Sequence, residues 1–149
     1  MIPKFRFWYE REDFYPDENF MSNVWQIEYV TDSIIYLNDS FTFNPYTNVA
    51  GSSYAKAKIY LMQSTGLKDK NGIEIYEGDI VKVTQYLGGM ARGRLIHLVE
   101  KSKYNNNLML IRKSKRSFLP EVSLRFNRSK DYEVIGNIYE NPELLEEIE

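Results

Sequence analysis

Residues 61–83 read Leu61-Met-Gln-Ser-Thr-Gly-Leu-Lys-Asp-Lys-Asn-Gly-Ile-Glu-Ile-Tyr-Glu-Gly-Asp-Ile-Val-Lys-Val83, a succession of short apolar segments and sharp turns. Asn71-Gly72 tolerates the positive φ angles of a type I′ turn, which predicts that Lys70 and Ile73 flank a tight connection. Glu77-Gly78-Asp79 predicts a second bend. Short strands with a glycine at each corner are typical of small, strongly curved barrels, because glycine removes the Cβ clash at a kink.

Apolar and polar side chains alternate on both sides of the second bend. Ile73 and Ile75 share one face, and Val81 and Val83 share one face after the bend. A period of two is the strand signal, so this central module is predicted to consist of half-buried β-strands.

The same signal extends outward along the chain. Strands are predicted at residues 1–10, 25–30, 33–37, 93–100, 108–112 and 132–139, with the second and third forming a hairpin. In the first strand, Phe5, Phe7 and Tyr9 are expected to form one mainly aromatic face. Residues 38–53 are rich in Asn, Ser, Thr, Pro and Gly, which predicts an irregular loop with at most one edge strand.

Three further segments carry local secondary-structure signals of other kinds. Residues 55–62 fit either a short helix or a strand. Pro120 confines any strand within residues 118–126 to a sheet edge or a strand start. Asn141-Pro142 predicts a short acidic C-terminal helix, with Asn141 as the N-cap and Pro142 at the first helical position.

The predicted fold class is mainly β, with a small SH3-like, barrel-type sheet made by the central and C-terminal blocks. An N-terminal β extension and the short C-terminal helix complete it. Residues 1–54 are expected to form an N-terminal β segment with an irregular loop, packed on the rest, and residues 55–149 to form the barrel module. A single integrated domain is the alternative.

Composition narrows the class of protein. The 149 residues are 43% hydrophobic and 27% charged, as in globular proteins, and 12 Tyr, 8 Phe and 2 Trp favour pleated structure. Cysteine is absent, which suits a reducing compartment and excludes disulfides, thiolate catalysis and zinc sites of the cysteine type. No apolar run approaches about 18 residues and no signal peptide is recognisable, so a cytoplasmic location is expected and no membrane partner.

The basic charge is concentrated in one part of the chain. Residues 92–130 hold 11 Lys and Arg against two acids, whereas the remainder holds 8 against 19, although the net charge is only -2. Segregated charge steers association with polyanions or with acidic surfaces. The partner is therefore expected to contact residues 92–130.

Three blocks of the sequence resemble the YopX family of small phage and prophage proteins. They are residues 1–8, residues 61–83 and residues 132–145, with Thr65-Gly-Leu-Lys-Asp-Lys-Asn-Gly72 and Tyr76-Glu-Gly-Asp-Ile-Val81 as the most specific phrases. The resemblance implies a protein encoded by a bacteriophage or prophage and a mostly β fold, with the central and C-terminal blocks in a barrel-like sheet. It implies no activity and no catalytic residues.

Candidate catalytic and ligand motifs are weak. Placing Gly72 at the sixth position of a calcium loop puts Leu67 where an acid is required, so a turn is the better interpretation. Residues 88–93 are glycine-rich but lack the Lys-Ser/Thr of a phosphate-binding loop, which favours a flexible hairpin over a phosphate cradle. His97 shares a face with Leu95 and Val99, which favours a partly buried structural role.

No motif of an enzyme is present. Gly51-Ser-Ser53 does not supply the elbow of a serine nucleophile, and no spaced pair of carboxylates stands out as an acid and base. We therefore expect a protein without catalytic, cofactor-binding or metal-binding residues, with a small enzyme as the less favoured alternative.

Clustered cations beside aromatic residues form the candidate binding patch, since such clusters hold phosphates and stack bases. The patch is predicted to comprise Arg92, Arg94, Tyr104, Arg112, Lys113, Lys115, Arg116, Arg125, Arg128 and Lys130. The alternatives are an ordinary solvated surface and a patch that pairs with the acidic C-terminal helix of the same or another chain. The expected function is that of an interaction protein, expected to form homo-oligomers, that binds a host or phage protein or nucleic acid in the bacterial cytoplasm.

Overall fold

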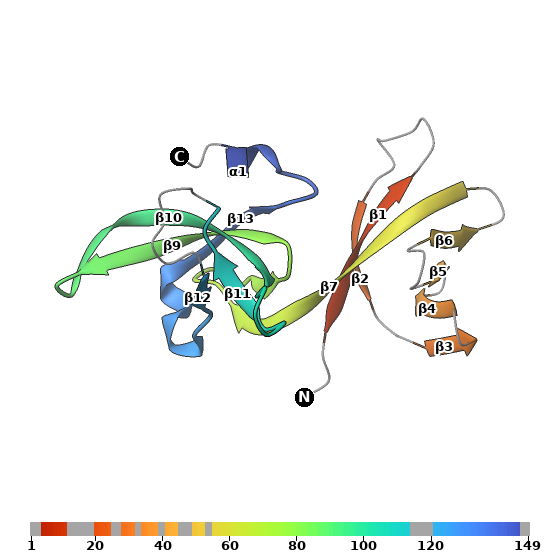
Figure 1. Cartoon of the computed structure of the whole chain (residues 1–149), viewed down its shortest axis with the longest axis horizontal. Coiled ribbons are helices and arrows are strands. Elements are labelled where there is room, and N and C mark those ends of the chain that lie inside the picture. The colour runs from red at the N-terminus through yellow and green to blue at the C-terminus, as the bar shows by residue number, and fades with distance from the viewer. Residues whose placement is uncertain are drawn as a thin grey trace. The chain divides into compact units, whose positions relative to one another are not determined.

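The computed structural model describes residues 4–11, 20–24, 28–31, 34–38, 41–44, 49–52, 55–113 and 121–146. The protein is mainly β and divides into two compact units, residues 1–63 and residues 64–149. The sequence had suggested a division after residue 54. Strand β7 runs without a break from Ala55 to Lys68, so the observed division falls inside that strand (Figure 1).

The first unit is built around one antiparallel sheet. Its strands are β1 (Phe5–Arg11), β2 (Phe20–Val24), β3 (Glu28–Thr31), β4 (Ile34–Asn38), β5 (Phe41–Asn44), β6 (Val49–Ser52) and the first part of β7 (Ala55–Lys68). They lie in the order β2-β1-β7-β6-β5-β4-β3. Strand β1 lies between β2 and β7 and is paired on both edges, with Phe7 opposite Ser22 and Leu61.

Burial along β1 follows this position. Phe7 is completely buried, Tyr9 and Met62 are also buried, and so is Trp8 on the other face of the strand. The predicted aromatic face with Phe7 and Tyr9 is present.

Two predictions for the first unit can be compared with its strands. The hairpin of the second and third predicted strands is confirmed by the antiparallel pairing of β3 and β4. The prediction of an irregular loop over residues 38–53 is wrong, because β5 and β6 each pair on both sides. The open choice at residues 55–62 is settled as a strand, β7.

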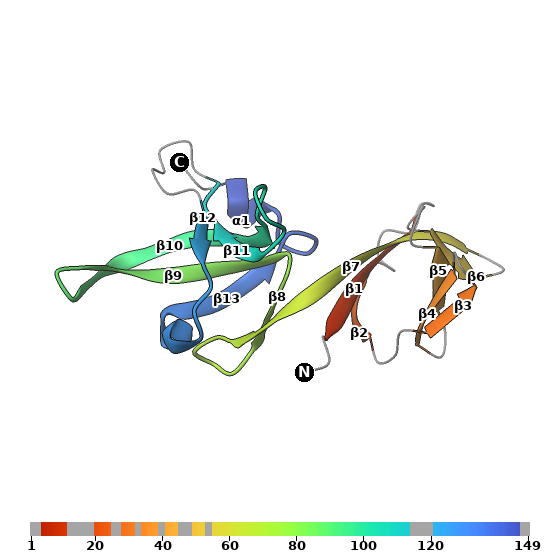
Figure 2. The same ribbon diagram turned by 60° about the horizontal axis from the view of Figure 1, so that its bottom comes forward.

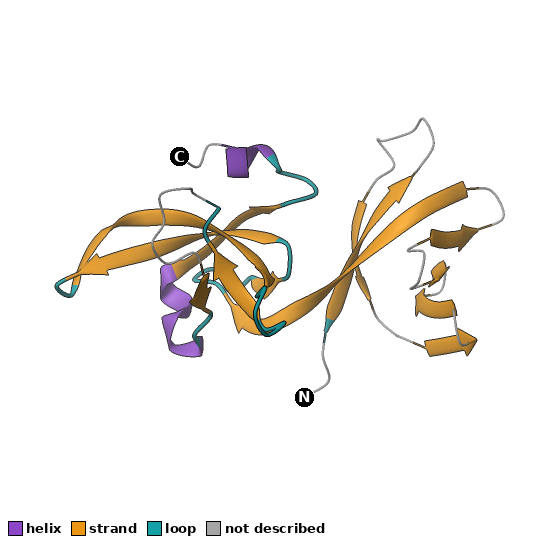
Figure 3. Cartoon of the chain, in the orientation of Figure 1, coloured by secondary structure: helices purple, strands orange, loops and turns teal. Residues whose placement is uncertain are grey.

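The second unit contains a curved five-stranded sheet, and the last part of β7 pairs with a short strand there. Its elements are β8 (Glu74–Tyr76), β9 (Asp79–Leu87), β10 (Met90–Lys101), β11 (Leu108–Ile111), β12 (Glu121–Ser123), the 3₁₀ helix η2 (Phe126–Asp131), β13 (Tyr132–Asn137) and α1 (Glu143–Glu146). The sheet order is β12-β11-β10-β9-β13. Figure 2 shows the β9–β10 hairpin reaching beyond the other strands of this unit, and Figure 3 shows its two short helical segments.

The curved sheet encloses an apolar core, which confirms the predicted barrel-type fold. Ile75, Val81, Val83, Val99 and Leu110 are buried there together with Tyr132. The pairing of β9 with β10 shifts register between Ala91 and Arg94, where Gly93 has a φ of +120°. Such a bulge increases the local twist, which helps a sheet of few strands to curl. Strand β12 is an edge strand, as the proline before it predicts.

The connection between β7 and β8 differs from the predicted type I′ turn. The amide of Gly72 donates to the carbonyl of Asp69 at 3.0 Å, and Gly72 has a φ of +79°, whereas Asn71 is not in the left-handed region. This is a three-residue hairpin loop that ends in a left-handed glycine. The carboxylate of Asp69 accounts for the difference, because its Oδ1 accepts the amides of Asn71 and Ile73. The predicted bend at Gly78 is confirmed, with a φ of +88°.

The end of the chain contains the predicted short helix, α1. Its predicted side-chain cap is absent, because Oδ1 of Asn141 accepts the amide of Asn137 instead. The backbone carbonyl of Asn141 accepts the amide of Leu144 at 3.2 Å. Asn141 therefore joins the helix start to the end of β13.

Candidate functional site

A pocket of about 330 Å³ opens on the curved sheet of the second unit. It lies where strands β9, β10, β11 and β12 meet the segment from η2 to the start of β13. Its lining consists of Val83, Thr84, Gln85, Tyr86, His97, Leu110, Val122, Ser123, Arg125, Arg128 and Tyr132. Apolar core residues form the inner part, and tyrosine, histidine and two arginines bring polar chemistry to it. This combination is typical of small-ligand sites.

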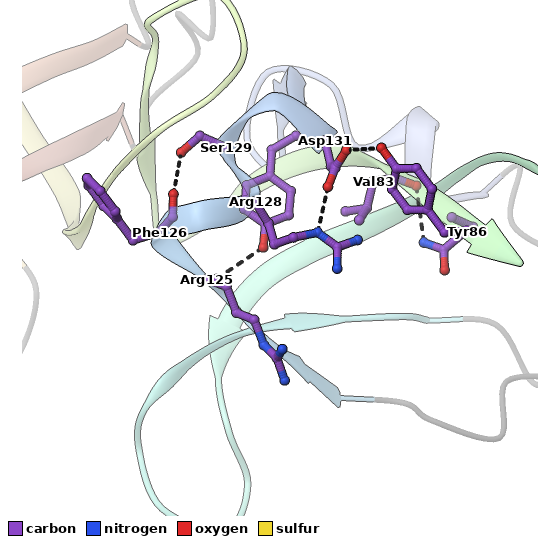
Figure 4. Close-up of polar contacts among 9 residues, drawn as sticks. Val83, Tyr86, Arg125, Phe126, Arg128, Ser129 and Asp131 are labelled. Atoms are coloured by element: carbon purple, nitrogen blue, oxygen red, sulfur yellow. Dashed lines mark hydrogen bonds and ion pairs between the residues drawn. The ribbon is translucent and has the colours of Figure 1, made fainter. Parts of the chain in front are cut away.

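One carboxylate organises the charged wall of the pocket. Asp131 is only 4% exposed, and its Oδ1 accepts a hydrogen bond from the hydroxyl of Tyr86 (Figure 4). Its Oδ2 accepts Nε of Arg128 at 2.6 Å. The guanidinium of Arg128 also lies 5.3 Å from the centre of the Tyr86 ring. Asp131 thus fixes the positions of two lining side chains that come from different elements.

The charge states of this cluster follow from its contacts. Burial acts to raise the pKa of Asp131, but the hydrogen bonds from Tyr86 and Arg128 outweigh it and hold the pKa below its usual value of 3.8. The bond to Asp131 raises the pKa of Tyr86, so that hydroxyl stays protonated, and the same carboxylate raises the pKa of Arg128. The cluster therefore holds one anion and one cation at neutral pH.

The pocket has donors left for an anionic ligand. Arg128 uses Nε for Asp131, which leaves the two terminal nitrogens of its guanidinium without a partner among the described residues. The side chain of Arg125 is exposed and makes no hydrogen bond or ion pair with the described part of the chain, while its backbone amide donates to the hydroxyl of Tyr132 at 3.1 Å. Two guanidinium groups can therefore bind phosphate or carboxylate oxygens.

His97 lines the same pocket in a defined tautomer. Its Nδ1 lies 3.1 Å from the carbonyl oxygen of Leu95. A carbonyl only accepts hydrogen bonds, so the proton resides on Nδ1 and the neutral imidazole carries a lone pair on Nε2. Burial lowers the pKa of His97 below its usual 6.5, and the charge of Arg112 lowers it further, against the opposing effect of the Leu95 carbonyl. His97 is thus a neutral acceptor at pH 7, and its predicted buried position is confirmed.

The pocket is bordered by residues 125–130, which we call the basic-aromatic segment. It contains Arg125, Arg128 and Lys130, and Phe126 with 81% of its surface exposed. Figure 4 shows the ring of Phe126 on the opposite side of the segment from the guanidinium groups. The 3₁₀ turn that holds this arrangement is closed by the amide of Arg128, which donates to the carbonyl of Arg125 at 3.0 Å.

The structure divides the ten residues of the predicted patch among several places. Arg92 and Arg94 lie on β10, and Tyr104 lies in the turn beyond its other end. Because β10 has 12 residues, these ends are roughly 35 Å apart. Lys115 and Arg116 lie outside the described residues. Arg125, Arg128 and Lys130 are the members that the structure brings together beside the pocket.

Several cations of the patch have partners within the unit. Arg94 and Lys70 both pair with Glu133, and these contacts lower the pKa of Glu133. Lys113 pairs with Glu100 at 2.9 Å, and Arg112 donates to the carbonyl of Ile96 at 3.0 Å. The two glutamates offset the charge of Arg94 and Lys113, whereas Arg112 keeps its charge and is held by a backbone carbonyl.

Sequence reasoning did not find the aromatic and polar part of the site. Tyr86, Gln85, Ser123 and Asp131 were not singled out, and His97 was interpreted only as a structural residue. Tyr86 and Asp131 lie 45 residues apart, so no local pattern connects them. The one available signal was the string Arg-Phe-Asn-Arg-Ser-Lys-Asp at residues 125–131, which interleaves cations with an aromatic residue.

Two further observations concern the described part of the chain. Among these residues, no group of three or more His, Asp or Glu is placed to hold a metal ion. The helices found there are too short and too polar to cross a membrane.

One comparison with known proteins names a family. The family model described as YopX protein matches residues 4–146. A crystal structure of protein EF1440 from Enterococcus faecalis is similar, with 32% identity, a TM-score of 0.52, and coverage of 97% of this chain and 99% of that chain. No curated protein matches the sequence.

Proposed function

The chain belongs to the YopX protein family, and from that premise we propose that it is a non-enzymatic interaction protein that binds single-stranded nucleic acid. The contacts would be made by the basic-aromatic segment and the adjoining pocket. This is a narrower surface than the whole of residues 92–130, because several cations of that stretch are paired within the protein.

The observation that supports this function is the exposure of Phe126, which lies between Arg125 and Arg128 in the sequence and points to the opposite side of the segment from their guanidinium groups (Figure 4). Its ring is 81% exposed, and Arg125 and Lys130 have no ion-pair partner in the described part of the chain. Proteins that bind single strands combine cations that follow the phosphates with aromatic rings on which bases stack.

The state of Asp131 favours binding over catalysis. Its carboxylate is occupied by Tyr86 and Arg128. An acid–base pair would require groups that face the reacting atoms with a pKa near the working pH. The low pKa of Asp131 does not suit that role.

The proposal includes the source and location of the protein. The resemblance to phage and prophage proteins supports an origin in a bacteriophage or prophage genome. The absence of cysteine supports action in the reducing cytoplasm of the bacterial host.

The test is the binding of a fluorescent single-stranded oligonucleotide, measured by anisotropy for the wild type and two variants. Phe126→Ala removes a stacking ring, which is worth about 1–3 kcal/mol per base and so weakens binding about fivefold to 150-fold. Tyr104→Ala is the matched control, because Tyr104 is 75% exposed but lies in the β10–β11 turn. The proposal is contradicted if Tyr104→Ala loses oligonucleotide binding and Phe126→Ala does not. It is also contradicted if the wild type binds polyglutamate as tightly as it binds the oligonucleotide.

A second function, self-assembly, is favoured by the β9–β10 hairpin arm, residues 84–95. Leu87 is 70% exposed and Met90 is 62% exposed at its tip, and Tyr86 and Leu95 are 44% and 37% exposed. Exposed apolar residues in a cluster mark protein-interaction surfaces. Light scattering should show a homo-oligomer that dissociates in the Leu87→Ser, Met90→Ser double variant. If the wild type remains a monomer at high protein concentration, self-assembly through this arm is excluded.

A further inference from the structure

We propose that the pocket beside the basic-aromatic segment binds one nucleotide whose base carries an amino group, with its phosphate on Arg125 and Arg128 and its base inside. The inference rests on the proposed function, since both use these arginines, and it specifies what the pocket recognises. The nucleotide is either a free nucleoside monophosphate or one unit of a longer strand.

The volume and the lining set the class of ligand. About 330 Å³ lies at the lower end of the range of roughly 300–1,000 Å³ for small-molecule pockets, which suits one nucleotide. The inner wall offers Val83, Leu110 and the ring of Tyr132, all buried, as apolar surface for a flat base. The rim offers the two arginines. A ligand that is apolar and planar at one end and anionic at the other matches this division.

The phosphate position follows from how Arg128 is held. Asp131 binds Nε at 2.6 Å, which fixes the guanidinium plane and leaves its two terminal nitrogens as a fork of donors. The Tyr86 ring lies against the same guanidinium at 5.3 Å. A planar fork with fixed orientation suits phosphate oxygens, and the unpaired charge of Arg125 adds a second guanidinium.

The preference for an amino-bearing base follows from two acceptors in the lining. The Nδ1–H of His97 is used by the Leu95 carbonyl, so Nε2 presents a lone pair. Nε2 of Gln85 donates to the carbonyl of Val83 at 3.1 Å, so Oε1 of that amide is left as an acceptor. Both acceptors line the pocket, so a ligand that brings N–H donors can pair with them, whereas a ligand without such donors would take them from water and leave them unpaired. Adenine, cytosine and guanine supply an amino group, whereas uracil does not.

The test is titration of the full-length protein with nucleoside 5′-monophosphates by calorimetry. Adenosine or cytidine monophosphate should bind at one site, at least tenfold more tightly than uridine monophosphate, inorganic phosphate or unphosphorylated adenosine. Val122→Trp should fill the pocket and abolish this binding, because Val122 lines the pocket. The variant should still fold, because Val122 is 39% exposed on edge strand β12, where a larger side chain is tolerated. Gln85→Leu should remove the preference over uridine monophosphate while the melting temperature shows the variant folded.

The same titrations with a ten-nucleotide strand separate this inference from the proposed function. Strand binding without any saturable mononucleotide binding, or mononucleotide binding unchanged in folded Val122→Trp, overturns the pocket inference and leaves the proposed function standing. Mononucleotide binding that Val122→Trp abolishes, without strand binding, overturns the proposed function and identifies a free nucleotide as the ligand. If the protein binds neither the mononucleotides nor the ten-nucleotide strand, both the pocket inference and the proposed function are overturned.

Discussion

The hydroxyl of Tyr86 on strand β9 donates a hydrogen bond to the carboxylate of Asp131, which lies 45 residues later at the end of η2. The same carboxylate holds Nε of Arg128. This one buried anion therefore determines where the tyrosine and the arginine of the pocket wall point. A short 3₁₀ helix alone would not fix them, since its hydrogen bonds are few and of poor geometry.

Replacing Asp131 with Asn should destabilise the protein and disorder the pocket wall. Hydrogen bonds to a charged group are worth about 1.5–3 kcal/mol, so the free energy of unfolding is expected to fall by about that amount in urea titrations. The wild type has a depressed Asp131 pKa, so its contribution is fully present above pH 3.8 and is lost as the pH falls through the lower folded value. The Asp131→Asn variant does not show this loss of stability in acid, because its side chain does not ionise. Equal acid sensitivity below pH 3.8 in both proteins would contradict the assignment.

Asp69 is expected to be the most important single side chain for the β7–β8 connection. Its carboxylate accepts the amides of Asn71, Ile73 and Val134, and the side chain is 4% exposed. Asp69→Ala leaves three backbone donors without this acceptor and should cost about 2–4 kcal/mol at about 1 kcal/mol for each bond. Hydrogen exchange provides the specific measurement. The Val134 amide should exchange faster in the variant relative to the rest of β13, and unchanged protection there would refute the contact.

His97 should make stability depend on pH between neutrality and mild acid. Its pKa is lowered in the folded protein, mainly by burial, so the unfolded chain takes up the proton first as the pH falls below 6.5. Stability is therefore complete above pH 6.5 and is lost progressively as the pH falls toward the folded pKa. Melting temperatures at pH 7.5 and 5.5 should differ more for the wild type than for His97→Gln. The same difference in both would show that His97 is not protected from protonation.

Gly136 is predicted to tolerate no side chain. A Cβ at this position would lie 2.5 Å from Oδ1 and 2.9 Å from Cβ of Asn141. That oxygen accepts the Asn137 amide, so moving it breaks the junction between β13 and α1. Gly136→Ala should cost about 1–3 kcal/mol, as overpacked sites do. Adding Asn141→Gly removes the clash but not the lost hydrogen bond, so it should restore part of the stability. No recovery in the double variant would contradict this cause.

The strands with local signals were predicted correctly from the sequence. The alternation around Val81 and Val83, the bend at Gly78 and the final strand from Tyr132 depend on neighbours in the chain, and all three are present. Strands β5 and β6 were missed because their stability comes from pairing on both sides. Pairing overrides a composition of Asn, Ser and Pro, and a single sequence does not display it.

The site was predictable only in its cations. Arg125, Arg128 and Lys130 belong to the basic stretch that the charge distribution identified, and the structure places them next to one another. The type I′ prediction failed because Asp69 closes its own turn, and the pocket was missed because Tyr86 joins Asp131 across the fold. The Asp69 contacts are local, with residues two and four positions later, whereas the partner of Tyr86 is set by the three-dimensional structure.

The most direct test of the proposed function is the salt dependence of binding to a single-stranded oligonucleotide. Two double variants remove the same charge, Arg125→Gln with Lys130→Gln at the site, and Lys101→Gln with Lys103→Gln on exposed positions at the far end of β10. Each phosphate contact contributes about 0.7 to the slope of log K against log salt for single strands, so losing two contacts should make the slope shallower by about 1.4. The proposal predicts that change for the site variant and the wild-type slope for the control. Equal slopes in the two variants would contradict it.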